Sequence, residues 1–342
     1  MVQAVDAAGN PSDRVRSGDG TAEPAGTGPE VTAAARLPEQ PRPTVTAPTG
    51  WDRARPVLVS LAWVGPALAL ILGVVVWPAI EMVRTSLSKI SSVGVPRGWA
   101  GLENYTDLFE ESELGWVLLR TVVWVIGVVV VTMLISLALA QLLNANFPGR
   151  TVVRWAVIVP WAASVLMTAL VWKWMLNHYY GVVNRLLMDL GVIDQPVSWL
   201  SESGSALPWM MWVAVFVSLP FTSFVILAGL QAIPGEVYEA ARMDGAGAAR
   251  TYLSVTLPLL RPSLLVAAII NVINVFNSFP IIWAMTRGGP GYATDTTTTY
   301  VFKLFESKQI GEAGAMSVVN FLLVIAMVLV YLRVTRWREE TA

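Results

Sequence analysis

The sequence predicts an all-α integral membrane protein that crosses the bilayer with six transmembrane helices. Of its 342 residues, 55% are hydrophobic and only 14% are charged, whereas soluble domains carry about 25% charged residues. The mean hydropathy of the chain is +0.58. Six apolar runs are long enough to cross a bilayer as helices, which takes about 20 residues each. They lack the period-two alternation of a membrane β-barrel, so the predicted class is helical.

Residues 1–50 differ from everything that follows. They are rich in Pro, Gly, Ala and Thr, carry both charge signs and show no apolar period. Such a segment buries too little surface to offset the entropy lost on ordering. We therefore expect a disordered cytoplasmic tail, and its first residues do not have the pattern of a signal peptide.

Residues 51–342 are expected to form one membrane domain containing the six helices in order. The first run carries no charge, and the third lies between Arg154 and Lys173. The fourth is uncharged but is interrupted by Pro208 and Pro220. Basic side chains bound most of the runs, where they can reach the aqueous interface. The predicted helices span about 57–80, 117–143, 152–176, 206–231, 262–286 and 313–333.

The distribution of basic residues orients these helices. If both termini are cytoplasmic, the inner segments close to the membrane are enriched in arginine, as the positive-inside rule expects. The polar connection 234–258 would then also lie in the cytoplasm. The inner arginines are Arg53, Arg55, Arg150, Arg154, Arg242, Arg250, Arg261, Arg333, Arg336 and Arg338.

The connection between the fourth and fifth predicted helices carries the most informative motif of the chain. Residues 239–258 read EAARMDGAGAARTYLSVTLP. The small side chains of Ala240 and Ala241 allow a close approach between helices, and Gly245 can adopt the positive φ that a sharp turn needs. Pro258 begins to redirect the chain toward the next helix.

This connection resembles the cytoplasmic EAA loop of bacterial ABC importer permeases. The family pattern is Glu-Ala-Ala, three residues, Gly, nine residues, Ile or Val, one residue, Leu-Pro, and Val255 falls in register with it. In the family, two short helices of this loop dock into a cleft of the ATP-hydrolysing subunit. A surface hairpin that contacts no partner is the alternative. The resemblance implies the ATPase-coupling residues Glu239, Ala240, Ala241, Asp244, Gly245, Leu257 and Pro258.

Other segments narrow the resemblance to permeases that import carbohydrates. GLENYTDLF (101–109) is similar to a Gly-Leu-x-Asn-Tyr segment of that branch, and residues 288–291 form its Gly-Gly-Pro-Gly loop. The implied fold is the six-helix bundle of type I, maltose-permease-like importers. A disaccharide such as trehalose or maltose is the expected substrate. Between residues 179 and 208 the family pattern is carried by Gly181, Asn184, Leu187, Gly191, Trp199 and Leu200.

The resemblance also implies that the chain does not transport alone. Its expected partners are a second homologous permease in a heterodimer, a cytoplasmic ABC ATPase dimer and an extracytoplasmic sugar-binding protein, in a bacterial cell membrane. The sequence has no Walker A motif, so ATP hydrolysis belongs to a partner and the chain is not expected to be an enzyme. With no cysteine and one histidine, no metal or cofactor is expected. No basic patch suggests a nucleic-acid partner.

Polar residues inside the fourth and fifth predicted helices are the candidates for binding sugar. Asn271, Asn274 and Ser278 are spaced by three and four residues, which places them on one helical stripe, with Asn277 at its border. Ser218 and Phe221 lie beside Pro220 in the fourth helix. In the resembled family the sugar site draws on these two helices. Interhelical hydrogen bonds that only hold the bundle together are the alternative.

Three other functions fit the sequence less well than an ATP-driven importer does. A secondary transporter coupled to ions would need acidic or basic side chains within the membrane, and the six runs have uncharged interiors. An intramembrane enzyme would need paired carboxylates or a histidine-rich site. A structural scaffold would leave the 239–258 pattern without a role.

Overall fold

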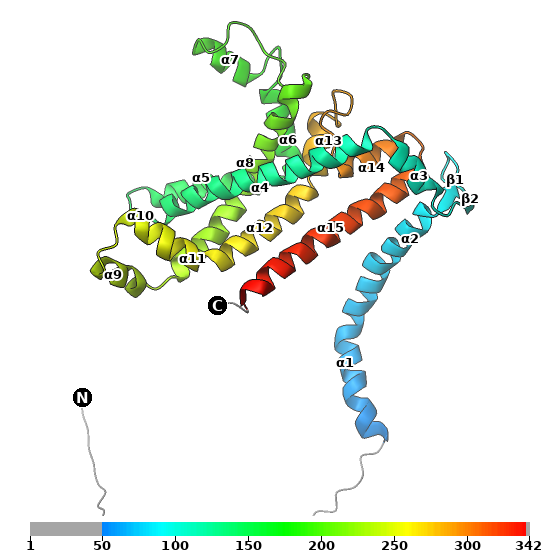
Figure 1. The fold of residues 1–342 in the computed structure, drawn as a ribbon, viewed down its shortest axis with the longest axis horizontal. Helices are drawn as coiled ribbons and strands as arrows, with labels where there is room; N and C mark the ends of the chain where they lie inside the picture. The colour runs from blue at the N-terminus through cyan, green and yellow to red at the C-terminus, as the bar shows by residue number, and fades with distance from the viewer. Residues whose placement is uncertain (1–49, 340–342) are drawn as a thin grey trace, which may run out of the picture. The chain divides into compact units, whose positions relative to one another are not determined.

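The structure is a computed structural model that describes residues 50–339, and it is mainly helical (Figure 1). The predicted disordered tail lies outside the described residues, except for its last residue. The chain divides into two units, residues 1–63 and 64–342.

The described elements follow one another in this order along the chain: α1 (Gly50–Leu70), a π-helix (Ile71–Val76), α2 (Trp77–Ser86), β1 (Ser88–Ile90), β2 (Pro96–Trp99), α3 (Glu103–Glu110), α4 (Leu114–Asn144), α5 (Arg150–Ala162), α6 (Val165–Met175), α7 (Val182–Asp189), α8 (Ser203–Ala232), α9 (Gly235–Met243), α10 (Ala248–Thr251), a second π-helix (Tyr252–Thr256), α11 (Leu257–Leu259), α12 (Arg261–Phe276), α13 (Phe279–Met285), α14 (Thr297–Glu306) and α15 (Ile310–Glu339). The two strands pair antiparallel, with an irregular register between Lys89 and Ile90.

Several described helices are long and apolar enough to cross a bilayer. Four single helices meet this criterion of length and composition. A fifth span is obtained if Ala248–Leu259 and Arg261–Phe276, which are bent by 64° relative to each other, count as one. This supports a multi-pass membrane protein, while the exact number of six crossings stays a prediction. The four single spans are Ala62–Ser86, Leu114–Asn144, Ser203–Ala232 and Ile310–Arg333.

The prediction of one continuous third helix over 152–176 is wrong. The structure divides this run into α5 and α6, with Ala163 and Ser164 between them. Ser164 has extended backbone angles, and its hydroxyl accepts a hydrogen bond from the Met167 backbone N–H at 3.2 Å. A serine in this position caps a new helix start and thereby ends the previous helix.

The prediction of one continuous fifth helix over 262–286 is also wrong, because α12 ends at Phe276 and α13 begins at Phe279. The Asn277 amide donates to the Ile273 carbonyl at 2.9 Å, and the Ser278 hydroxyl donates to the Val275 carbonyl at 2.6 Å. These bonds occupy carbonyls at the end of α12. Pro280 follows at the start of α13, where its missing N–H is tolerated.

The fourth predicted helix is continuous in spite of its two prolines. Helix α8 contains both Pro208 and Pro220, and it packs against α4 and α12. In the core between these helices, the Trp124 indole N–H of α4 donates to the Val275 carbonyl of α12 at 3.0 Å. Polar donors in apolar surroundings need such partners, and this bond ties α4 to the end of α12.

Candidate functional site

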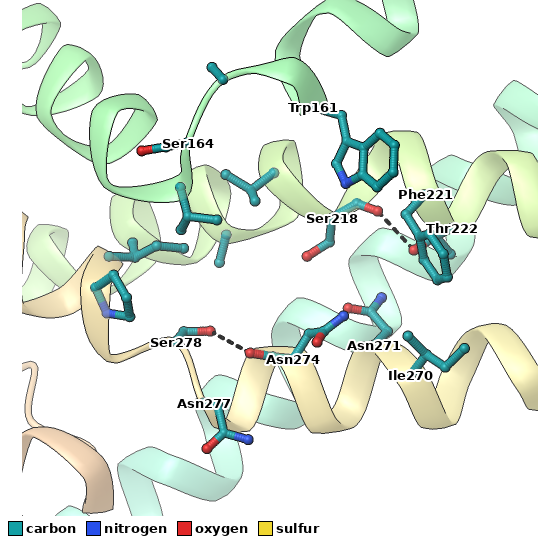
Figure 2. A pocket seen from close by; sticks show the side chains of 16 residues that line it. Trp161, Ser164, Ser218, Phe221, Thr222, Ile270, Asn271, Asn274, Asn277 and Ser278 are labelled. Atoms are coloured by element: carbon teal, nitrogen blue, oxygen red, sulfur yellow. Dashed lines mark hydrogen bonds between the residues drawn. The ribbon is translucent and has the colours of Figure 1, made fainter. Parts of the chain in front are cut away.

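A cavity of about 570 Å³ lies where the two helix breaks face α8. Figure 2 shows its lining side chains, which come from the α5–α6 break, α8, α12 and the α12–α13 break. The structure therefore brings together segments more than 100 residues apart in sequence. All six predicted substrate residues line this one cavity: Asn271, Asn274, Asn277, Ser278, Ser218 and Phe221.

Asn271 is the most unusual of these residues. Its side chain is 2% exposed, and neither its amide oxygen nor its amide nitrogen has a hydrogen-bond partner in the described part of the chain. A buried amide without partners costs on the order of 1–3 kcal/mol. This cost makes Asn271 a group that gains from a polar ligand or from water in the cavity.

Asn274 and Ser218 complete a set of free polar groups. Figure 2 shows the Asn274 side chain next to that of Asn271 on α12, with Ser218 on the neighbouring helix α8. No hydrogen bond of the Asn274 amide or the Ser218 hydroxyl occurs among the described residues; only their backbone carbonyls accept bonds, from Ser278 and Thr222. The three side chains offer donors and acceptors together, as sugar hydroxyl groups require.

Asn277 and Ser278 have a different role from the one that their spacing predicts. Both line the cavity, but the Asn277 amide and the Ser278 hydroxyl already donate hydrogen bonds to backbone carbonyls of α12. Their hydrogen bonds shape the α12–α13 break. The predicted stripe thus contains two free amides, followed by two residues that end the helix.

Aromatic side chains border the same cavity. Phe221 on α8 was predicted, whereas Trp161, which is 60% exposed at the end of α5, was not. The sequence signal that could have indicated a helix break beside Trp161 is the presence of Pro160 and Ser164, which interrupt an otherwise apolar run. An aromatic face beside hydrogen-bonding groups suits a sugar ring, which has apolar C–H faces and a polar edge.

The cavity lining holds no Asp, Glu, Lys, Arg or His among the described residues. Its polar groups are amides and hydroxyls, which are neutral at every physiological pH. Ionised ligands keep their charge in a low-dielectric site only when an opposite charge accompanies them. The arrangement is therefore suited to an uncharged polar ligand.

The segment 234–258 forms two short helical parts joined by a tight turn. Gly245 has a φ of +74°, as its predicted turn requires, and it follows the end of α9. Three backbone bonds close that end, from the N–H groups of Asp244, Gly245 and Ala246 to carbonyls of α9. Only glycine adopts this backbone conformation without strain.

The predicted coupling residues occupy both sides of this turn. Ala241 is nearly buried, whereas Glu239, Ala240, Asp244 and Gly245 are exposed. Leu257 and Pro258 form α11 together with Leu259 and are half-buried. The exposed residues of α9 and its turn form a surface that a partner could contact, and their docking role stays a prediction.

Two motifs outside the cavity hold the connections between helices. Asn104 donates to the carbonyls of Ser86 and Ser88 at 2.8 and 3.0 Å, and the Tyr105 hydroxyl donates to the Ser86 hydroxyl at 2.8 Å. They tie α3 to the end of α2. The Asn-Tyr pair of the 101–109 segment therefore positions α3 against the end of α2.

Asn184 does the same in the connection between α6 and α8. It is 2% exposed, and its amide nitrogen donates to the carbonyls of Asn177, His178 and Val197. Its amide oxygen accepts from the Val197 N–H and from the Trp199 indole at 2.8 Å. One asparagine therefore links the start of α7 to the segment that leads into α8.

The family model described as the binding-protein-dependent transport system inner membrane component matches residues 104–339. The chain belongs to this family. The match covers the cavity, the 234–258 segment and α15, and it agrees with the ABC importer permease resemblance. This permease is thus a multi-pass transport component of the membrane.

Individual relatives agree with this membership. The permease is 37% identical over 277 residues to a probable ABC transporter permease of Brucella suis, covering 81% of this chain and 96% of that protein. It is 35% identical over 275 residues to the trehalose/maltose transport system permease protein MalF of Thermococcus litoralis, covering 80% and 92%. A solved bacterial ABC transporter for the import of the acidic polysaccharide alginate has a TM-score of 0.74 at 22% identity, covering 84% and 98%. This last likeness shows the fold.

Proposed function

We propose that this permease is one of two homologous subunits that form the membrane pathway of an ATP-driven, binding-protein-dependent sugar importer. Its proposed substrate is an uncharged disaccharide such as trehalose or maltose. The observation that carries the proposal is the cavity in which Asn271 and Asn274 present free amides beside the aromatic rings of Trp161 and Phe221. The printed name of the Thermococcus litoralis relative supports the class of substrate.

The proposed mechanism is alternating access. An extracytoplasmic sugar-binding protein delivers the sugar to the cavity when it opens outward, and a cytoplasmic ATPase dimer drives the change of state. The 234–258 segment would transmit the movement, with α9 and its exposed residues docked on the ATPase and both termini cytoplasmic. Sugar hydroxyls would exchange water for the amides of α12, so that the cost of leaving Asn271 unpartnered is removed on binding.

The α12–α13 and α5–α6 breaks give this mechanism its moving parts. A continuous helix resists local bending, whereas a break held by a few side-chain bonds can change its angle. Both breaks border the cavity. A change at either one would alter the cavity without requiring α4 and α8 to be repacked.

An ion-coupled secondary transporter is the competing function, and two observations disfavour it. The described lining of the cavity has no ionisable side chain that could bind a proton or pair with a coupling ion. The family match also points to a transporter served by a binding protein.

The decisive experiment reconstitutes the permease with its second permease, its ATPase and its sugar-binding protein in proteoliposomes. We expect uptake of radiolabelled trehalose or maltose only with ATP on the cytoplasmic side and with the binding protein present. An acidic disaccharide of the same size should not compete. Uptake that follows a sodium or proton gradient without ATP would overturn the importer proposal, whereas equal uptake of the acidic sugar would overturn only the substrate class.

A further inference from the structure

Helix α7, in the connection between α6 and α8, exposes an apolar stripe although it lies outside the predicted membrane helices (Figure 1). Val182, Leu186 and the C-cap residue Leu190 are spaced by four residues and therefore share one face of the helix. Each of these side chains is more than half exposed, and so is Val192 just beyond the helix. A contiguous apolar surface of this kind marks a contact with a membrane or with another protein.

The other sides of α7 face the protein and water. Asn184 is buried and bonded to the segment that leads into α8, and Val183 packs against the core cluster that includes Met210 of α8. Arg185 and Asp189 are exposed, and helical geometry places them along one border of the apolar stripe. Helix α7 therefore has one side held by the protein, one polar side, and one apolar side that no described segment covers.

The apolar stripe is continuous with exposed apolar surface on α6 and α8. Two grooves join α7 to these helices, and each has a residue from the start of α7 in its lining. The first, of about 580 Å³, is lined by Val182 and Tyr180 and by Met167, Leu170, Val171, Trp174 and Met175 of α6. The second, of about 540 Å³, is lined by Val183, by Trp172 and Met175 of α6, and by Pro208, Trp209 and Trp212 of α8. Because α8 is one of the helices long and apolar enough to cross a bilayer, one apolar surface runs from a membrane span onto α7.

Aromatic residues mark the level of the membrane–water boundary at this junction. Trp174, Tyr180 and Trp212 are all exposed where α6 ends and α8 begins, and the rings of Trp174 and Tyr180 lie 6.1 Å apart. Tryptophan and tyrosine are enriched at the level of lipid headgroups, because their rings are apolar and carry one polar group. The 30 residues of α8 rise about 45 Å, which exceeds the roughly 30 Å hydrocarbon core. The first turns of α8 therefore reach the headgroup level, and α7 is attached beside them.

Charge does not select a particular lipid for this surface. The ionisable side chains of the segment 173–202, apart from its tyrosines, are Lys173, His178, Arg185, Asp189, Asp194 and Glu202. Acidic groups slightly outnumber basic ones, so the segment offers no excess of positive charge to an anionic headgroup. Its apolar area is therefore the feature that a ligand would recognise, and lipid can cover this area together with the adjoining sides of α6 and α8.

From these observations we infer that α7 is an interfacial helix, whose apolar stripe enters the boundary between headgroups and acyl chains while Arg185 and Asp189 stay in water. Helix α7 would lie there whatever sugar the permease carries. Its attachment to the bilayer would hold one end of α6, whose other end lies at the α5–α6 break beside the cavity.

The test uses nitroxide spin labels on single cysteines, since the chain has none of its own. Leu186→Cys and Leu190→Cys probe the apolar stripe, and Arg185→Cys and Asp189→Cys are the matched controls on the polar side of the same helix. The assembled transporter, with partner subunits free of cysteine, is reconstituted in phosphatidylcholine vesicles. Collision of each label is measured with oxygen, which concentrates in the bilayer, and with a water-soluble nickel complex. We expect the oxygen-to-nickel ratio to be several-fold higher at the two leucine positions than at the two controls.

Equal ratios at all four positions would place α7 in water and overturn the inference. Low collision with both reagents at Leu186→Cys and Leu190→Cys would also overturn it, because the stripe would then be covered by protein, such as the second permease. Nickel access to the stripe that disappears only when the sugar-binding protein is added would identify that protein as the occupant in place of lipid.

Discussion

At the scale of single residues, α12 separates two uses of asparagine. Asn271 and Asn274 face the cavity with unbonded amides, whereas the Asn277 amide is bonded to the Ile273 carbonyl. The sequence spacing groups all three, because helical periodicity describes positions and not hydrogen-bond partners. Only the course of the backbone after Phe276 distinguishes them.

Alanine substitutions test this division. Asn271→Ala and Asn274→Ala should each raise the KM for trehalose or maltose uptake by about fivefold, since a lost neutral hydrogen bond costs about 1 kcal/mol. Asn277→Ala, the matched control on the same helix, should leave KM nearly unchanged and lower the thermal stability instead. The readouts are uptake kinetics and melting temperature in detergent. A raised KM for Asn277→Ala alone would contradict the assignment.

Asp295 is a second residue with a distinct environment. It lies between α13 and α14, is 0% exposed, and is paired with Lys303 of α14. Lys303 also donates to the Gly291 carbonyl at 2.9 Å, and Arg120 of α4 donates to the Tyr292 carbonyl at 2.6 Å. Burial raises the pKa of Asp295 to about 6, although the pairing with Lys303 opposes the shift.

This pKa predicts a stability that falls as pH rises. The folded chain binds the proton of Asp295 more tightly than the unfolded chain, whose pKa is near 3.8. Stability is therefore greatest below about pH 4 for this group and declines up to about pH 6, by on the order of 3 kcal/mol. We expect Asp295→Asn to flatten the melting temperature between pH 4.5 and 7.5, with Asp189→Asn as an exposed control. An undiminished pH dependence in Asp295→Asn would exclude Asp295 as its source.

At the scale of elements, the sequence predicted the apolar runs well and their interruptions poorly. The long runs behind α4, α8 and α15 are unambiguous because apolar length is a direct requirement of the bilayer. Pro220 interrupts the apolar run in the sequence but lies inside the continuous helix α8, which packs against α4 and α12. The actual breaks depend on Ser164, Asn277 and Ser278, whose side chains satisfy backbone groups only once the surrounding helices are arranged.

The turn after α9 was predicted correctly because it depends on one residue. Gly245 has a positive φ, and a Cβ added there would meet no atom within 4 Å. Substitution therefore acts through the backbone alone, and not through a clash. The same openness means that the surface is available to a partner.

Gly245→Val tests the turn. A β-branched residue strains this conformation, whereas asparagine tolerates it. We expect Gly245→Val to abolish ATP-dependent uptake while membrane insertion and sugar binding to the isolated binding protein persist, and Gly245→Asn to retain most uptake. Pull-down of the ATPase should fail in parallel for the valine variant. Normal uptake by Gly245→Val would remove the turn from the coupling mechanism.

At the scale of the whole molecule, helix α12 connects the cavity to the coupling segment. Helix α12 carries the two free amides, and the α10–α11 part of the coupling segment leads directly into its start with a 64° bend. Movement of a docked α9 could thus reach the cavity along α12. No residue pattern in the sequence gives this geometry, because it depends on the angle at Leu260.

The most direct test of a sugar pathway uses the absence of cysteine from the chain. In the assembled transporter carrying Asn274→Cys, a membrane-impermeant thiol reagent should label the new side chain. Trehalose or maltose delivered by the binding protein should slow this labelling several-fold, while Asp189→Cys on α7 labels at an unchanged rate. If Asn274→Cys remained unlabelled from both sides of the membrane, or labelled at the same rate with and without sugar, the cavity would not be the route of the substrate.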